Sequence, residues 1–123
     1  MTVPELAEVD HGQMAGLTST DIERLFPGEL GRRAGDRFRW RFPGGESYAD
    51  ADRRAVTALE RIVRSGSRRP LVVSHEMIGR MLRRHLVGAD PVTALSWNQP
   101  HDVVYRIDVN TRDLVEFRTE TNE

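Results

Sequence analysis

The sequence predicts an α/β domain, because helical and strand-like apolar patterns alternate along it. A helical spacing over 47–65 is followed by a short apolar run at 71–74 and a second helical pattern over 77–87. Two segments with period-two alternation, 103–109 and 114–119, then predict a hairpin. With 123 residues and 38% hydrophobic residues, the chain is sized for a single domain with one modest core.

The N-terminal half predicts one short helix, a loop and one long helix. The short helix covers about 19–26, where Ser19 or Thr20 can cap its start. Residues 27–45 hold two Pro and five Gly, which favour an irregular covering loop. Ser47 then caps the long 47–65 helix.

The run 71–74, Leu-Val-Val-Ser, is typical of a strand buried on both faces of a sheet. It leads directly into His75 and the 77–87 helix, which Gly88 ends. Ligands of open α/β sheets bind beyond the carboxyl ends of strands, and the N–H groups of a helix start suit phosphate. His75 can therefore hold a phosphoryl oxygen or move protons, or it can serve only to cap the strand–helix joint.

The composition excludes several classes of protein. No stretch approaches 18 consecutive apolar residues, which excludes a membrane span, and the acidic N-terminus shows no secretory signal. The absence of cysteine excludes disulfides, thiolate metal sites and a cysteine nucleophile. We therefore expect a soluble cytoplasmic protein.

Every basic side chain outside histidine is arginine, and the segment 24–84 holds fifteen Arg against seven acidic residues. Arginine suits bidentate capture of phosphate or carboxylate, so the excess favours an anionic ligand. A solvated helix surface is the alternative. Nucleic acid is not expected as a partner, because the basic segment lacks the aromatic interleaving of RNA-binding motifs.

Three segments resemble the histidine phosphatase superfamily, the phosphoglycerate mutase-like proteins. Segment 71–82, LVVSHEMIGRML, resembles the family's second histidine motif. Segment 6–18 resembles the stretch in which an acidic residue precedes Gly-x-x-x-Gly-Leu-Thr, and 43–47, Pro-Gly-Gly-Glu-Ser, is similar to the segment before the family's long helix. The resemblance covers about residues 5–107.

The resemblance implies a three-layer α/β/α fold and phosphomonoester hydrolysis or phosphoryl transfer through a phosphohistidine, with no metal and no cofactor. His75 matches the second catalytic histidine, which binds the transferring phosphoryl group. Glu8 matches the acidic residue that acts as general acid, a role suited to a carboxyl kept protonated by burial and phosphate charge. The implied substrate is a phosphorylated small molecule or a phosphoprotein.

The family's nucleophile lies in an Arg-His-Gly motif that residues 1–123 do not contain. His11-Gly12 follows Asp10 rather than Arg and is rejected as a substitute, and Glu76 stands where many members have Gly. We therefore expect one partial domain, truncated at its N-terminus and lacking the central first strand. The isolated chain is expected to show no turnover and to form homo-oligomers or a molten state.

Two functions from different classes stay open. Restored upstream sequence coding for Arg-His-Gly would make the protein a phosphatase, and its absence would favour an inactive pseudoenzyme, a binding subunit or a gene fragment.

The other histidines have lesser roles: His85 is expected in solvent, and His101 lies in a loop that is either inert or close to the same pocket. No metal site is expected, because the side chains that could bind a metal ion do not have the sequence spacing of a known metal site. These side chains are Asp10, His11, His75 and His101.

Overall fold

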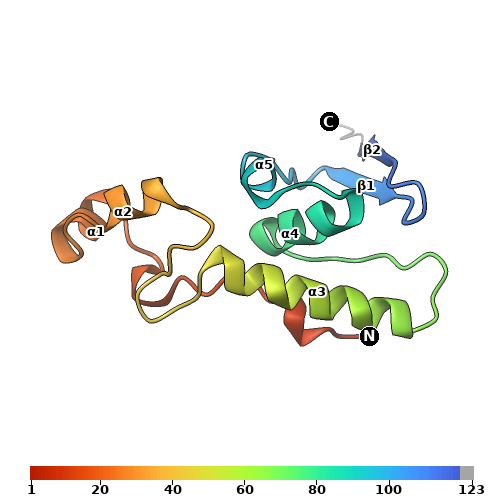
Figure 1. The fold of residues 1–123 in the computed structure, drawn as a ribbon, viewed down its shortest axis with the longest axis horizontal. Helices are drawn as coiled ribbons and strands as arrows, with labels where there is room; N and C mark the ends of the chain where they lie inside the picture. The colour runs from red at the N-terminus through yellow and green to blue at the C-terminus, as the bar shows by residue number, and fades with distance from the viewer. Residues whose placement is uncertain (120–123) are drawn as a thin grey trace.

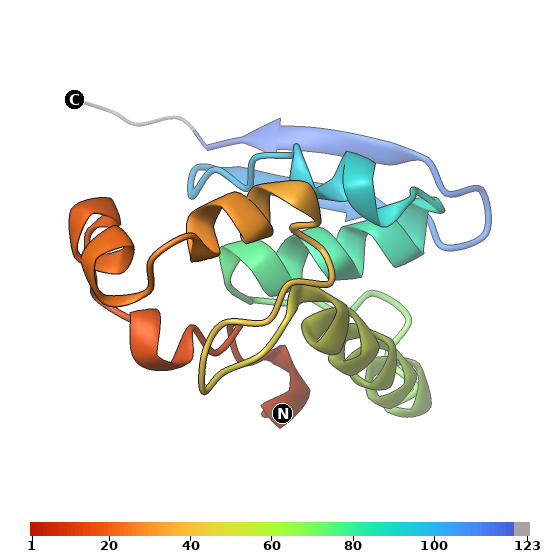
Figure 2. The same ribbon diagram turned by 60° about the vertical axis from the view of Figure 1, so that its left-hand side comes forward.

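The computed structural model describes residues 1–119 as two long helices stacked beneath a β-hairpin, with shorter helices at one end (Figure 1). Helix α4 lies between α3 and the hairpin in both Figure 1 and Figure 2. In chain order the elements are η1 (Pro4–Leu6), η2 (Gly12–Met14), α1 (Ser19–Leu25), α2 (Glu29–Gly35), α3 (Tyr48–Arg64), α4 (Glu76–Val87), α5 (Pro91–Leu95), β1 (Val103–Ile107) and β2 (Leu114–Arg118).

Helix α3 forms where the sequence predicts it, because Ser47 begins it with a reciprocal cap. The Ser47 hydroxyl accepts from the Asp50 N–H, and the Asp50 carboxylate accepts from the Ser47 N–H, both at 3.1 Å. The face toward α4 carries small side chains that are fully buried, so the two helices approach closely. These are Ala51, Ala55 and Ala58.

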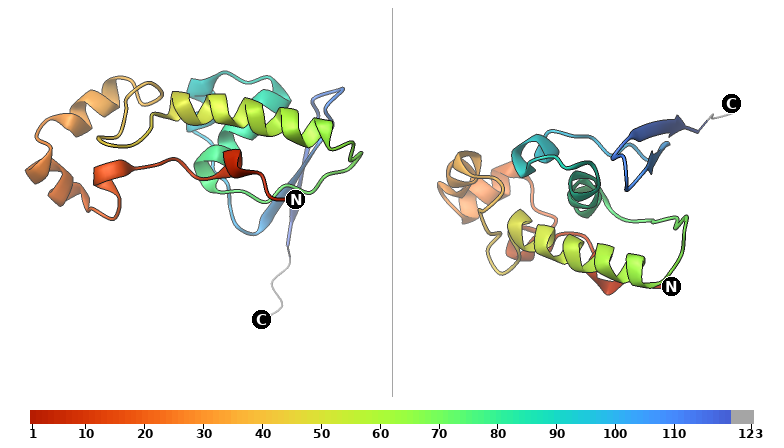
Figure 3. Two further views of the ribbon diagram at one scale, coloured as in Figure 1. Left: turned by 90° about the horizontal axis from the view of Figure 1, so that it is seen from below. Right: turned by 45° about the vertical axis from the view of Figure 1, so that its right-hand side comes forward.

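Helix α4 is also confirmed and supplies the centre of the core. Ile78 and Met81 are its largest fully buried side chains, and Gly88 ends the helix at φ 77°. The N-terminal residues lie along α3 in both views of Figure 3, with η1 packed against it. The buried cluster around α4 comprises Val9, Met14, Phe42, Tyr48, Ala51, Ala55, Ala58, Ile78, Met81, Leu82, Ala94 and Leu95.

The predicted hairpin is confirmed as two antiparallel strands. Val103 pairs with Arg118 at one end and Ile107 with Leu114 at the other. No other strand joins this sheet within residues 1–119. The described part of the chain is therefore helical with a small sheet, which is compatible with the α/β class.

The predicted buried strand at 71–74 is wrong for this structure. Leu71 and Val73 are 81% and 82% exposed, and no backbone hydrogen bond joins residues 71–74 to another segment of the described chain. A strand needs a neighbour to take its N–H and C=O groups, and no other strand of residues 1–119 pairs with this run. The run instead crosses as extended chain from the end of α3 to α4.

Three smaller expectations change as well. The loop predicted for 27–45 contains the two-turn helix α2, and the cap of α1 is Thr18, whose hydroxyl accepts from the Asp21 N–H at 3.1 Å. Helix α5 was missed, although Asp90 caps it before a proline at its first position. Within residues 1–119, no helix is both long enough and apolar enough to cross a membrane.

Candidate functional site

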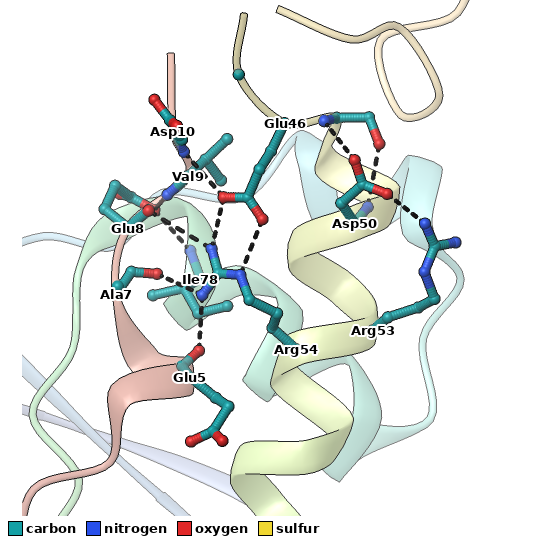
Figure 4. Close-up of polar contacts among 12 residues, drawn as sticks. Glu5, Ala7, Glu8, Val9, Asp10, Glu46, Asp50, Arg53, Arg54 and Ile78 are labelled. Atoms are coloured by element: carbon teal, nitrogen blue, oxygen red, sulfur yellow. Dashed lines mark hydrogen bonds and ion pairs between the residues drawn. The ribbon is translucent and has the colours of Figure 1, made fainter. Parts of the chain in front are cut away.

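The Glu8 carboxylate binds the first turn of α4. It accepts from the Met77 N–H at 2.9 Å and from the Ile78 N–H at 3.0 Å, and also from its neighbour Val9 at 2.9 Å. A carboxylate at a helix start satisfies N–H groups that have no intrahelical partner and interacts favourably with the helix dipole. The fold therefore brings Glu8 to the helix that His75 precedes, although Glu8 and Met77 are 69 residues apart (Figure 4).

His75 is the residue immediately before α4, in extended conformation, and its carbonyl accepts from the Gly79 N–H at 2.8 Å. Its ring makes no capping hydrogen bond and is exposed to solvent. The acceptor that caps the helix is Glu8, so the imidazole of His75 is free of the capping role considered from the sequence.

Glu76 is neutralised by an arginine one turn along α4. The Arg80 Nη2 lies 2.6 Å from the Glu76 carboxylate, and its Nη1 donates to the Leu95 carbonyl at 2.9 Å. The Arg80 side chain is 11% exposed, and its Nε is buried with no hydrogen-bond partner in the described residues. The sequence analysis did not identify this pair, although the Glu–x–x–x–Arg spacing on one helix face could have indicated it.

The loop 96–102 packs against the same turn of α4. A Cβ on Gly79 would lie 2.8 Å from the Gln99 amide nitrogen and 3.2 Å from the Ser74 hydroxyl, so glycine lets the loop come this close. Gln99, not singled out from the sequence, therefore borders the site. His101 follows two residues later, exposed and without a hydrogen bond within residues 1–119.

Two of the family-like segments pack against each other through glycine. Gly12 has φ 55°, and a Cβ there would collide with the Pro43 carbonyl oxygen. A Cβ on Gly45 would likewise collide with the Asp10 carbonyl, which accepts from the Glu46 N–H at 2.9 Å. These contacts set the backbone next to Glu8.

An ion pair holds this backbone to α3 (Figure 4). Arg54 donates from Nε and Nη2 to the two oxygens of Glu46, both at 2.9 Å, and Glu46 also accepts from the Asp10 N–H at 3.0 Å. Burial alone would raise the pKa of Glu46, but the hydrogen bonds from Arg54 and Asp10 outweigh it and hold that pKa below its usual value. Glu46 is therefore ionised at neutral pH.

Two of the other histidines, His85 and His11, contact side chains of the fold rather than the candidate site. The expectation of a solvated His85 is wrong: its Nε2 lies 2.9 Å from Asp52, which also pairs with Arg84 at 2.6 Å between α3 and α4. The ring of His11 packs edge-on against Phe42 with 4.7 Å between centroids. Within residues 1–119, no three His, Asp or Glu side chains gather closely enough to hold a metal ion.

Comparison with known proteins agrees with the motifs. The chain is 33% identical over 114 residues to a 6-phosphofructo-2-kinase/fructose-2,6-bisphosphatase of Caenorhabditis elegans, a match that covers 91% of this chain. It is 36% identical to a probable fructose-2,6-bisphosphatase of Schizosaccharomyces pombe and 32% identical to a fructose-2,6-bisphosphatase of Saccharomyces cerevisiae, each over 63% of this chain. The matches span 22%, 18% and 17% of those relatives' own lengths.

The match to a family model is broader than any of these pairwise matches. The model described as histidine phosphatase superfamily (branch 1) matches residues 1–119, which include Glu8, the 43–47 segment and His75. The chain therefore belongs to the histidine phosphatase superfamily.

Proposed function

We propose that this chain supplies part of the active site of a phosphomonoesterase, with His75 binding the transferring phosphoryl group and Glu8 acting as the general acid. One observation carries the proposal: the Glu8 carboxylate rests on the first turn of the helix that His75 begins. A carboxyl group and an imidazole ring at one helix start are suited to a phosphate ester, since one can give a proton and the other can bind a phosphoryl oxygen.

The geometry supports a specific order of events. The N–H groups of Met77 and Ile78 cannot serve the Glu8 carboxylate and a phosphoryl oxygen at once. An entering phosphoryl group would displace Glu8, and the nearby negative charge would favour the protonated carboxyl. As the P–O bond to the leaving group breaks, that carboxyl would give its proton to the leaving oxygen.

The new P–N bond would form on a nucleophilic histidine, which the family resemblance assigns to an Arg-His-Gly segment. Residues 1–123 contain no such tripeptide.

The three-layer α/β/α arrangement is part of the same proposal. In it, the extended, apolar 71–74 run would pair as a strand beside the segment that contains Arg-His-Gly. Without that segment, the same exposed run would favour self-association of the chain, and the alternative of an inactive relative would hold.

We further propose a phosphorylated sugar as the ligand. The relatives are named as fructose-2,6-bisphosphatases, and the local arginine excess of residues 24–84 suits a polyanion. Competition of fructose 2,6-bisphosphate against bound vanadate, compared with a phosphotyrosine peptide, distinguishes a sugar ligand from a phosphoprotein.

The test is vanadate binding to the purified chain, measured by titration. We expect His75→Ala to weaken binding about tenfold to a hundredfold, the loss of one charged hydrogen bond. His101→Ala is the matched control, because it removes an exposed loop histidine and should leave affinity unchanged. Failure of the parent chain to bind vanadate, or equal binding by parent and His75→Ala, would contradict the proposed site.

Hydrolysis of an aryl phosphate addresses the missing nucleophile separately. We expect the 123-residue chain to show no turnover, since a covalent mechanism without its nucleophile loses many orders of magnitude in rate. Turnover above about 1 s⁻¹ that His75→Ala abolishes would show that this chain needs no further segment.

A further inference from the structure

Arg54 makes more hydrogen bonds than any other side chain near the candidate site. Its guanidinium has five N–H donors, and each has an acceptor. Two of the acceptors are the oxygens of Glu46 at 2.9 Å. The others are the carbonyls of Glu5 at 2.8 Å, Ala7 at 2.9 Å and Glu8 at 3.5 Å.

These acceptors surround Glu8 along the chain. Arg54 fixes the backbone at and before Glu8, while Glu46 fixes the backbone after it by accepting from the Asp10 N–H. Because both side chains of the pair grip main-chain atoms, the Cα of Glu8 is held whatever its carboxylate does. Figure 4 shows the guanidinium between Glu46 and the carbonyls of this segment.

The contact is partly shielded from solvent. The side chains of Arg54 and Glu46 are 25% and 24% exposed, which is less than the Arg53 side chain next to them on α3 at 73%. A lysine at position 54 would offer three donors from one point and could not reach acceptors on both sides. The five-way arrangement thus depends on the planar guanidinium.

We propose that Arg54 is a positioning residue that holds Glu8 at the first turn of α4 without touching substrate. The inference takes the acid role of Glu8 from the proposed function, and the placement of the carboxylate can be measured independently of that role. The position of Glu8 is set by α3, through a main-chain clamp, rather than by the local conformation of its own segment.

The test is a double-mutant cycle followed by the backbone amide resonances of Met77 and Ile78. Removing the carboxylate in Glu8→Ala should move both resonances. Arg54→Lys should move them in the same direction, because the displaced carboxylate no longer binds these amides. The double variant should match Glu8→Ala alone, since displacing residue 8 has no further effect once its carboxylate is removed. Arg61→Lys is the matched control, since Arg61 also ties α3 to this segment through the Glu5 side chain at 3.0 Å and should move neither amide.

Met77 and Ile78 resonances unchanged in Arg54→Lys, or a double variant whose shifts add, would overturn the inference. If Arg54→Lys does not fold, Glu46→Gln takes its place, with a smaller movement in the same direction expected and no movement overturning the proposal. The measurement uses no phosphate, so vanadate binding can fail while the cycle succeeds, and the reverse. Failure of the positioning role and failure of the proposed function are therefore distinguishable.

Discussion

Residues 5–12 and residues 67–75 deliver the two halves of the candidate site, Glu8 and His75, in different ways. The first segment is held by contacts from other parts of the fold: the Arg54 side chain binds its carbonyls, and Gly12 lies against the Pro43 carbonyl. The second makes no backbone hydrogen bond to another segment over 71–74, and its apolar side chains face solvent. His75 is instead placed by α4, which packs against α3.

This difference shows what each segment needs in order to be ordered. The contacts that hold the first segment come from α3, from the 43–46 loop and from the first turn of α4, all within the described residues. The second segment has strand-forming residues and extended backbone, but strand order comes from a neighbour. A segment can therefore carry a site residue correctly while most of its own length lacks a partner.

The strongest way to break this comparison is the same substitution in each segment. Val9, beside Glu8, is 4% exposed, whereas Val73, before His75, is 82% exposed. Val9→Asp should destabilise the fold by about 4 kcal/mol or more, because it buries a charge without a partner. Val73→Asp should change the unfolding free energy by less than about 0.5 kcal/mol, as for an ordinary surface substitution.

Urea unfolding followed by circular dichroism measures both variants. Size-exclusion chromatography adds a second readout, because a charge in the exposed apolar run should also reduce self-association. A Val73→Asp variant as destabilised as Val9→Asp would mean that the 71–74 run is buried in solution.

A smaller effect is expected from two glycines with left-handed backbone, one in the first segment and one immediately before the second. Gly12 has φ 55° and Gly66 has φ 76°. Gly66→Ala should cost about 1 kcal/mol, the backbone strain alone, since nothing lies within 4 Å of the added Cβ. Gly12→Ala should cost about 2 kcal/mol more, because the Pro43 carbonyl must also move.

Thermal melts of the two alanine variants decide this prediction. Equal losses would show that the close approach of 12 to 43 is not maintained in solution, and the clamp around Glu8 would then be weaker than its hydrogen bonds indicate.

The sequence predicted the elements that are determined by residues close together in the chain. Helix α3 follows from Ser47 and the spacing of its alanines, and the end of α4 follows from Gly88, since caps and periodicity act within a few residues. The apolar pattern of residues 71–74 could not show whether they form a buried strand, because a strand is buried only when a neighbouring strand pairs with it. Helix α2 was missed because its two glycines disfavour a helix, whereas Glu29 stabilises it through Arg32 and Trp40.

The candidate site was predicted in part for the same reason. Glu8 was identified through a family-like motif, and His75 through its place before a predicted helix as well as a motif, but their spacing in sequence gave no sign that Glu8 caps α4. Arg54 and Gln99 were missed, because neither belongs to a local pattern and each acts on residues far along the chain. The solvated placement of His85 was wrong, since its partner Asp52 lies on another helix.

The smallest expected effect is the pH dependence of stability that Glu46 and its neighbour Asp50 contribute where α3 meets residues 5–12. The pKa of Glu46 is lowered from an ordinary value of 4.5, so its contribution to stability is complete above about pH 4.5 and is lost as pH falls through the lowered value. Asp50 behaves alike below about pH 3.8, because the Ser47 N–H and nearby arginines lower its pKa. Residues 67–74 contain no carboxylate and contribute nothing of this kind.

Denaturant titrations between pH 7 and pH 3 measure this dependence. Glu46→Gln should lower stability at pH 7 and flatten the decline toward pH 3, because the variant has no proton to take up at that position. Glu60→Gln is the matched control on α3, since Glu60 makes no side-chain hydrogen bond or ion pair within residues 1–119, and its decline should match that of the parent. A parent and Glu46→Gln with parallel profiles would mean that the Arg54–Glu46 pair adds nothing to the folded state. The Glu8 segment would then be held by the Arg54 hydrogen bonds to its carbonyls, by its backbone contacts with residues 43–46 and by the Glu8 carboxylate on α4.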